Sequence, residues 1–433
     1  MVSAGVLILA LCAASTPPPL LSSAPTSYAV TRRVASVTSV PSRPILSTAP
    51  PSRPVPSAAP SSPPAPPPAP SADPIPAPPP PPSPAPDPLT VLIDAMSPEQ
   101  LVGQLILLEW TRHGTSNDGA VAAVQAIHGG GVVLLGEGWT PEQTLAASQA
   151  LQASMSPTRV GAFIATDQEG GAVQRIGGAG MDAIPRATVQ GSWPAPDLAA
   201  QAAVWGAQLR ATGVNVNLAP VVDTVPADMA GTNPPIGGLG REFGGDPVVV
   251  GQSSAAFVTG MNQAGVLACL KHFPGLGRVD ANTDIASATD TATTATDPFV
   301  GAFRTALDAG PGMVMVSGAV YAQLDPDHQA IFSPAVITGL LRDQMGWDGI
   351  VLADAMSAQA VADRPPGQAA VEFVAAGGDL MLFDPAHAVE AQQALLAAMA
   401  SSPGFQAQVR ASVVRILTTK VNAGLVALPP VAG

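Results

Sequence analysis

The chain has 433 residues, of which 47% are hydrophobic and 4% aromatic, and its formal net charge is −13. That length is sufficient for a large buried core, and the excess of acidic groups argues against binding to nucleic acid or to anionic lipid. The only cysteines are Cys12 and Cys269, so a disulfide framework is excluded, and no Cys/His cluster has the spacing of a zinc site. We therefore expect no metal and no other cofactor.

The N-terminal region has the composition of an exported, tethered protein. Residues 6–11 form an apolar run followed by small residues, too short to span a bilayer, which predicts an export segment over residues 1–15. Cys12 follows a stretch that resembles a lipoprotein attachment site, except that Leu11 stands where Gly or Ala is usual. Lipidation of Cys12 is the one membrane attachment that we expect, and the protein is expected in the cell envelope or secreted.

Proline is concentrated in the segment that follows. Of the 49 prolines, 27 lie between Pro17 and Pro88, with Ser and Ala between them and no apolar period. Such a composition is typical of an extended spacer that buries nothing. The sequence therefore predicts a disordered linker over residues 16–87 and one folded domain over residues 88–433.

From residue 88 onward the chain alternates between helix signals and short apolar runs. Residues 97–100 (SPEQ) predict a helix start, with Pro at the first position and an acid in the first turn. Alanine-rich amphipathic stretches such as 197–212 and 365–376 separate the apolar runs, and a last helix is predicted over 405–422. Eight strands alternating with helices are typical of an α/β (β/α)8 barrel of the TIM type, although a doubly wound sheet has the same local pattern. The predicted strands are residues 105–110, 131–135, 162–166, 214–218, 266–270, 313–316, 350–353 and 380–383.

Polar residues follow most of the predicted strands. Asp167 follows the third strand, Asp223 the fourth, Lys271 and His272 the fifth, and Asp354 the seventh. A single acid at a strand end more often caps a helix. In a barrel, however, these ends converge on one face, so we expect one pocket that is rich in acids and hydrogen-bonding groups and suits a neutral polyhydroxyl substrate. Paired carboxylates are the groups that cleave glycosidic bonds.

Four segments resemble glycoside hydrolase family 3, in particular its β-N-acetylglucosaminidases and their secreted actinobacterial members. They are residues 167–175 (DQEGGAVQR), 240–243 (GREF), 271–275 (KHFPG) and 351–356 (VLADAM). Their order and spacing agree with the family from about residue 88 to residue 425. The resemblance implies a TIM-type barrel that acts on a glycan or muropeptide containing N-acetylglucosamine, as a monomer.

The resemblance also implies roles for individual residues. Asp354 would be the nucleophile of a retaining reaction, and cations around it would keep it ionised. The remaining matched residues would bind hydroxyls of the terminal sugar. The alternative for the two arginines is an ion pair that braces loops, and for the aspartate a helix cap. These sugar-binding candidates are Asp167, Arg175, Arg241, Lys271 and His272.

One segment departs from the family. The family carries an Asp-Ser-His triplet, whose His is the general acid/base, where this chain has Asn282, Thr283 and Asp284. We therefore predict that Asp284 acts as the acid/base once its loop closes, with Asp280 and Asp290 as competitors on the same loop. None of the other histidines is an obvious replacement. They are His113, His128, His328 and His387.

Three functions follow from these observations. The first is a retaining exo-β-N-acetylglucosaminidase that acts outside the cytoplasm on cell-wall fragments. The second is a sugar-binding lipoprotein with weakened catalysis, and the third is a β-glucosidase of the same family. Those glucosidases usually take the acid/base from a second domain, and the residues after the eighth strand are too few for one, which favours the hexosaminidase.

Overall fold

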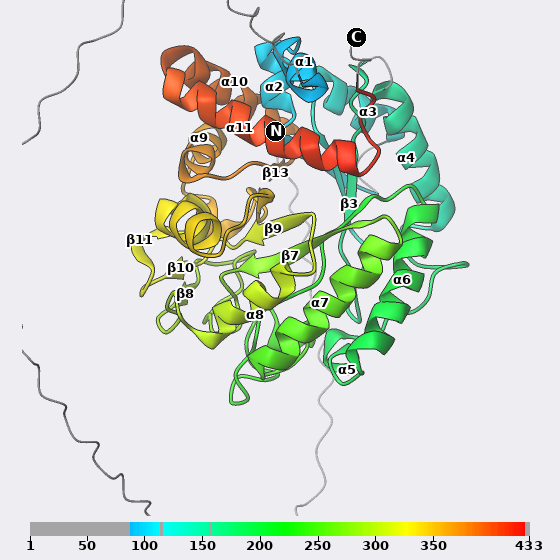
Figure 1. The fold of residues 1–433 in the computed structure, drawn as a ribbon, viewed down its shortest axis with the longest axis vertical. Helices are drawn as coiled ribbons and strands as arrows, with labels where there is room; N and C mark the ends of the chain where they lie inside the picture. Colours follow the sequence, from blue (N-terminus) through cyan, green and yellow to red (C-terminus); the bar gives the residue numbers. More distant parts are fainter. Residues whose placement is uncertain (1–86, 113–115, 156–157, 429–433) are drawn as a thin grey trace, which may run out of the picture. The chain divides into compact units, whose positions relative to one another are not determined.

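The computed structural model describes residues 87–112, 116–155 and 158–428 (Figure 1). The predicted export segment, nearly all of the predicted linker and Cys12 lie outside these residues. The first helix begins at Pro88, directly after Asp87, whose side chain caps it by accepting from Thr90 N.

Eight parallel strands form the predicted barrel. Their hydrogen-bonded order is β12-β9-β7-β6-β3-β2-β1-β13. A parallel bridge between Leu352 and Leu380 joins the two ends of that order, and Ala353 N donates to Leu380 O at 2.8 Å. The sheet therefore closes into a TIM-type (β/α)8 barrel, and the doubly wound alternative is wrong. The strands are β1 (Ile106–Thr111), β2 (Gly131–Leu135), β3 (Phe163–Thr166), β6 (Val216–Asn217), β7 (Leu267–Phe273), β9 (Met313–Val316), β12 (Ile350–Ala353) and β13 (Met381–Phe383).

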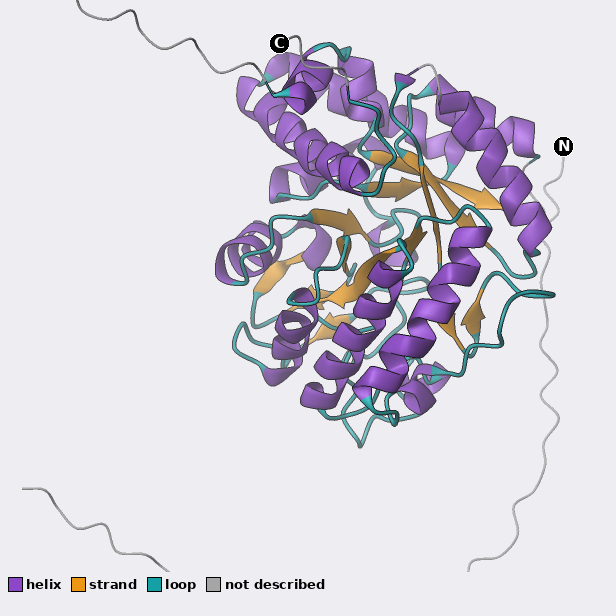
Figure 2. Cartoon of the chain, turned by 45° about the vertical axis from the view of Figure 1, so that its right-hand side comes forward, coloured by secondary structure: helices purple, strands orange, loops and turns teal. Residues whose placement is uncertain are grey.

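Helices surround these strands, as the purple ribbons around the orange arrows in Figure 2 show. The predicted helices over 197–212, 365–376 and 405–422 correspond to α6, α9 and α11. None of the helices in the described ranges is both long and apolar enough to cross a membrane. Apart from the short 3-10 helices, the described helices are α1 (Pro88–Asp94), α2 (Pro98–Gly103), α3 (Asn117–Ala126), α4 (Pro141–Met155), α5 (Ala187–Gln190), α6 (Ala195–Ala211), α7 (Pro247–Gln263), α8 (Pro298–Leu307), η4 (Ala335–Gln344), α9 (Pro366–Ala376), α10 (Pro385–Ser401) and α11 (Pro403–Asn422).

The predicted helix start at residues 97–100 is a capping box. Ser97 Oγ accepts from Gln100 N at 3.3 Å, while Gln100 Oε1 accepts from Ser97 N at 2.9 Å. Two backbone donors of the first turn are thereby satisfied, and Pro98 occupies the position where a missing N–H costs nothing.

Two strands, β6 and β7, differ from the prediction by more than one residue in length. The regular pairing of β6 covers only two residues, because side-chain amides replace part of the backbone ladder. Ile164 N donates to Asn215 Oδ1 at 2.8 Å, and Gln168 N donates to Asn217 Oδ1 at 3.0 Å. Conversely, β7 does not end before Lys271 but continues to Phe273. Lys271 O accepts from Val222 N at 2.6 Å, so pairing extends past the apolar run.

Smaller elements decorate the carboxyl end of the barrel. A hairpin follows β3. A three-stranded sheet in the order β11-β10-β8 pairs a short strand that precedes β9 in the chain with a hairpin that follows β9. These elements and three short 3-10 turns are β4 (Gln168–Gly170), β5 (Val173–Gln174), β8 (Thr289–Asp290), β10 (Val320–Tyr321), β11 (Asp325–Gln329), η2 (Gly237–Leu239), η3 (Ala330–Phe332) and η5 (Gln359–Val361).

Candidate active site

A cavity of about 380 Å³ opens at the carboxyl ends of the barrel strands. This is the end of a TIM-type barrel where ligands bind. All seven residues proposed from the sequence as site residues line it. They are Asp167, Arg175, Arg241, Lys271, His272, Asp284 and Asp354.

The hairpin of β4 and β5 folds Arg175 back towards Asp167. Gly170 and Gly171 form its turn with φ values of +107° and +59°, a region that favours glycine, and a Cβ on Gly170 would lie 2.4 Å from Pro185 O. Arg175 N donates to Asp167 O at 3.3 Å, and Arg175 Nε lies 3.9 Å from Asp167 Oδ2. The two side chains therefore face the cavity from the two ends of one hairpin.

Lys271 lies between two carboxylates on the cavity wall. Its Nζ is 2.7 Å from Asp167 Oδ1 and 2.6 Å from Glu169 Oε1, and its side chain is 2% exposed. Burial lowers the pKa of Lys271, but the charges of Asp167 and Glu169 outweigh that effect and raise it above the usual value. Lys271 is therefore a fixed cation over the whole neutral range.

Arg241 binds Glu169 in a bidentate ion pair. Nε donates to Oε2 at 2.9 Å and Nη2 to Oε1 at 2.7 Å. Burial raises the pKa of Glu169, but the charges of Arg241 and Lys271 outweigh it and hold the pKa well below its usual range. Glu169 therefore remains a carboxylate. Sequence reasoning did not single it out as a site residue, although it lies within the DQEGG segment.

Asn233 fixes the loop that carries Arg241. Its Oδ1 accepts from Ile236 N and Gly237 N, both at 3.1 Å, while its Nδ2 donates to Leu276 O at 2.9 Å. One buried amide thus ties the Arg241 loop to the loop after β7. Since Arg241 Nη1 also donates to Pro235 O at 2.9 Å, the guanidinium is held from both sides.

His272 is oriented by Asp223, an acid that follows the fourth predicted strand but is not among the predicted site residues. His272 Nδ1 lies 2.7 Å from Asp223 Oδ2, and Asp223 Oδ1 accepts from the backbone N–H groups of His272 at 3.0 Å and Leu276 at 2.8 Å. The fully buried carboxylate fixes the ring and the loop together. Gly277 permits this arrangement, because a Cβ there would lie 1.8 Å from Thr224 O.

Asp354 follows β12 and lies in the same cavity. Its Oδ1 accepts from Ala355 N at 2.9 Å. Burial raises the pKa of Asp354, the charge of His272 lowers it, and that of Asp284 raises it again, so that the net shift is upward. The expected effect of surrounding cations is present, since His272 and Lys271 both lower the pKa of Asp354, but burial outweighs it.

The loop bearing Asp284 is already held over the cavity. Asp284 O accepts from Gln359 N at 3.2 Å and Thr283 O accepts from Ala360 N at 3.1 Å, which joins this loop to η5, a few residues after Asp354. Asp284 therefore lines the pocket with its loop in this position. Its side chain remains exposed.

The two competing acids, Asp280 and Asp290, accept hydrogen bonds within their own loop instead. Asp280 Oδ1 accepts from Thr289 N at 3.1 Å, and buried Asp290 accepts from Ala292 N and from both the backbone and the hydroxyl of Thr293. Neither lines the cavity.

Three of the four histidines outside the KHFPG segment lie in the described residues, and none of these three lines the cavity. His328 bonds Asp325, His387 bonds Asp384, and His128 lines a different cavity. His113 lies outside the described residues. In the described ranges, no group of three or more His, Cys, Asp or Glu is placed to hold a metal ion.

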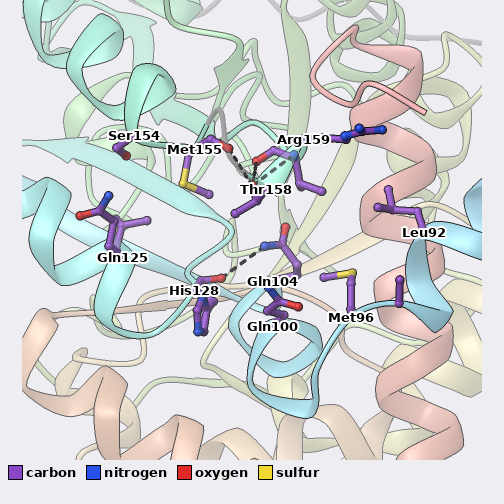
Figure 3. A pocket seen from close by; sticks show the side chains of 13 residues that line it. Leu92, Met96, Gln100, Gln104, Gln125, His128, Ser154, Met155, Thr158 and Arg159 are labelled. Atoms are coloured by element: carbon purple, nitrogen blue, oxygen red, sulfur yellow. Dashed lines mark hydrogen bonds between the residues drawn. The ribbon is translucent and has the colours of Figure 1, made fainter. Parts of the chain in front are cut away.

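That different cavity, of about 510 Å³, lies at the opposite end of the barrel. Figure 3 shows the side chains that line it. Gln104, His128 and Val160, which line it, precede β1, β2 and β3 in the chain, and Gln104 Nε2 donates to His128 O at 3.3 Å. Its described lining contains no Asp or Glu, so chemistry that needs two carboxylates cannot take place there.

Comparisons with known proteins identify the family of the chain. The sequence of the glycosyl hydrolase family 3 N terminal domain matches residues 99–419. An uncharacterized secreted glycosyl hydrolase of Arthroderma benhamiae is 32% identical over 53% of this chain and 65% of its own length. A beta-hexosaminidase of Stenotrophomonas maltophilia is 35% identical over 44% of this chain and 57% of its own length. This chain thus spans less than two thirds of the length of either relative.

Among solved structures, the beta-N-acetylhexosaminidase from Beutenbergia cavernae is 41% identical with a TM-score of 0.73, and the match covers 75% of this chain and 99% of that one. The barrel, the order of the motifs and these likenesses lead to one conclusion. The chain belongs to glycosyl hydrolase family 3, through the N-terminal domain of that family.

Proposed function

We propose that the chain is a retaining exo-β-N-acetylglucosaminidase that releases terminal N-acetylglucosamine from cell-wall (peptidoglycan) fragments. The observation that carries this proposal is that Asp354 and Asp284 line one cavity, whose wall also presents the ion-paired groups of β3 and β7. The names of two relatives, beta-hexosaminidase and beta-N-acetylhexosaminidase, support the choice of sugar.

The first chemical step is assigned to Asp354 and Asp284. A carboxylate oxygen of Asp354 attacks the anomeric carbon and forms an ester bond to it, while the glycosidic C–O bond breaks. Asp284 donates its proton to the departing oxygen, so that the leaving group departs as a neutral alcohol.

The second step reverses these roles. Asp284, now ionised, takes a proton from water as the water oxygen bonds to the anomeric carbon and the ester to Asp354 breaks. Two displacements restore the original anomeric configuration. Both acids end in the protonation states in which they began.

The ion-paired side chains of Asp167, Lys271 and Arg241 are suited to bind the sugar hydroxyls. Lys271 and Arg241 donate from fixed positions, and Asp167 accepts. Because Asp223 binds Nδ1 of His272, the other ring nitrogen, Nε2, is left to contact the substrate. Arg175 is the least constrained of the five groups, since its Nε has no hydrogen-bond partner.

The predicted N-terminal segments and the description of one relative support a location of the protein outside the cytoplasm. The predicted export segment over 1–15 and linker over 16–87, with or without lipidation of Cys12, would place a monomeric barrel outside the cytoplasm, where cell-wall fragments occur. The description of the Arthroderma benhamiae relative as secreted supports an extracellular role.

The test is an assay of purified protein on aryl β-N-acetylglucosaminide and aryl β-glucoside side by side. We expect turnover of the first and little of the second. Preference for the glucoside would favour the β-glucosidase reading, and binding of N-acetylglucosamine without turnover of either would favour a sugar-binding protein.

The acid/base assignment has a sharper test in Asp284→Ala, with Asp280→Ala as the matched control on the same loop. Asp284→Ala should cripple substrates with poor leaving groups but spare glycosylation by activated aryl glycosides. Azide should then accelerate the second step, since an anionic nucleophile needs no base. Unchanged hydrolysis of both substrate types by Asp284→Ala would remove Asp284 from the mechanism.

A further inference from the structure

Glu109 lines the active-site cavity together with the carboxylates of Asp167, Asp284 and Asp354, and the proposed mechanism does not use it. It lies near the end of β1, its side chain lines the cavity, and Ser357 Oγ donates to its Oε1 at 2.8 Å. In the described part of the chain, Oε2 of Glu109 receives no hydrogen bond, and no Lys, Arg or His nitrogen lies within 4.0 Å of either oxygen.

Four other acids around the barrel mouth have cationic or imidazole partners, whereas the side chains of Asp284 and Asp354, which the proposed mechanism uses, have none within 4.0 Å in the described residues. Asp167 and Glu169 are neutralised by cations, Asp223 binds His272, and Asp384 caps α10 and pairs with His387. A carboxylate that is half-buried and lacks a cation is costly to keep. Burial raises the pKa of Glu109, in keeping with a group that lacks sufficient compensation from the protein alone.

The position of Glu109 indicates which part of a substrate it faces. In the closed ring of eight strands, β1 lies four strands from β7, so Glu109 stands across the barrel from Lys271 and His272. Its partner Ser357 is exposed and follows Asp354 by three residues, whereas Lys271 and His272 have side chains only 2% and 7% exposed. Glu109 and Ser357 therefore lie on the solvent side of Asp354, opposite the groups assigned to the terminal sugar.

We infer that Glu109, held by Ser357, is a specificity-determining residue that binds a hydrogen-bond donor on the leaving-group sugar. The inference rests on the proposed function, which places the anomeric carbon at Asp354 and the departing unit towards solvent. The donor is a hydroxyl or an ammonium group. An ammonium group would be the better partner, because a hydrogen bond between two charged groups is stronger than one from a hydroxyl, and no cation lies within 4.0 Å of Glu109 in the described residues.

The experiment compares Glu109→Gln with the parent on three substrates. One is an aryl β-N-acetylglucosaminide, which has no leaving-group sugar; the second is the disaccharide of two N-acetylglucosamine units; the third is the same disaccharide with a free amine on its reducing-end unit. The matched control is Glu137→Gln, an exposed glutamate after β2 that does not line the cavity.

For Glu109→Gln we expect an unchanged kcat/KM on the aryl substrate and a loss on the disaccharides, because only these contain the contacted unit. The loss should be about threefold to tenfold for a hydroxyl contact, and about ten- to a hundredfold on the amine-bearing disaccharide for an ammonium contact. Ser357→Ala should give a smaller loss with the same substrate dependence, and Glu137→Gln should give none.

Two outcomes would overturn the inference. Equal losses on aryl and disaccharide substrates would mean that Glu109 acts on the terminal sugar or only on the fold, and no loss on any substrate would mean that it touches none. Failure of the parent protein to turn over the aryl substrate would instead count against the proposed function, so the two failures are distinguishable.

Discussion

The chain contains only two lysines, Lys271 and Lys420, and the barrel buries both, one at each end. Lys271 lies at the carboxyl ends of the strands between two carboxylates, and its pKa is raised. Lys420 lies at the opposite end, where its Nζ donates at 2.8 Å to Gln104 Oε1 and to Gly130 O. Burial without a carboxylate lowers the pKa of Lys420 to about 7.

The difference shows that burial alone does not identify a functional charge. Lys420 has neutral partners, lies 4.8 Å from the centre of the Phe163 ring and lines neither of the two cavities described above, so it joins α11 to the bottom of the barrel. Lys271 and its partner Asp167 both line a cavity. The surroundings, rather than the residue type or its depth, separate a binding group from a structural one.

The largest effect should follow Asp354→Asn at the functional end. Turnover of aryl β-N-acetylglucosaminide should fall by several orders of magnitude, because an amide cannot form the glycosyl ester. The fold should remain intact, as measured by circular dichroism. A variant with near-normal turnover would remove Asp354 from the chemistry.

The same variant should be more stable than the parent at neutral pH. Burial raises the folded-state pKa of Asp354, so the ionised form destabilises the fold at any pH above that value, and the amide removes this penalty. The gain in Tm should therefore shrink as the pH falls towards the pKa of an unfolded aspartate. A gain that persists at low pH would assign the effect to packing instead.

Lys271→Met should damage both binding and stability. Removing one partner of a buried ion pair typically costs about 3–5 kcal/mol, and here Asp167 and Glu169 both lose the ammonium group. We expect a lower free energy of unfolding in urea and a large fall in kcat/KM for folded protein. Because the pKa of Lys271 is raised, the parent's advantage should persist through neutral pH and decline only at alkaline pH.

Lys420→Met is the matched substitution at the structural end, and it should leave kcat/KM unchanged. Between pH 7 and the ordinary lysine pKa, the unfolded parent binds a proton that the folded parent has released, so parent stability rises with pH by up to about 1.4 kcal/mol per unit. The variant lacks that contribution. Urea unfolding at several pH values should show this difference in slope, and parallel curves would contradict the low pKa of Lys420.

The smallest effect should follow removal of residues 1–85. The predicted linker has no apolar period, so the remaining barrel should keep its Tm and its activity. A truncated protein that aggregates or melts at a much lower temperature would show that the N-terminal region packs on the barrel.

The sequence by itself determined the barrel strands and the motifs whose residues line the cavity. Each strand was recognisable because its apolar run is local, and the motif around Asp167 and the one around Lys271 were recognisable because their residues are contiguous. The capping box at Ser97 is equally local. These features depend on neighbours within a few residues, which is the range over which sequence patterns are informative.

Only the tertiary structure decided which charges are paired and which face the cavity. Asp223 and His272 are separated by 49 residues, and Asp167 and Lys271 by 104, so their pairing depends on the register of strands around a closed ring. The position of Asp284 at the cavity likewise depends on backbone hydrogen bonds between its loop and η5, a segment about 75 residues further along the chain. Local sequence cannot encode such distances, because they are fixed only when the last strand closes on the first.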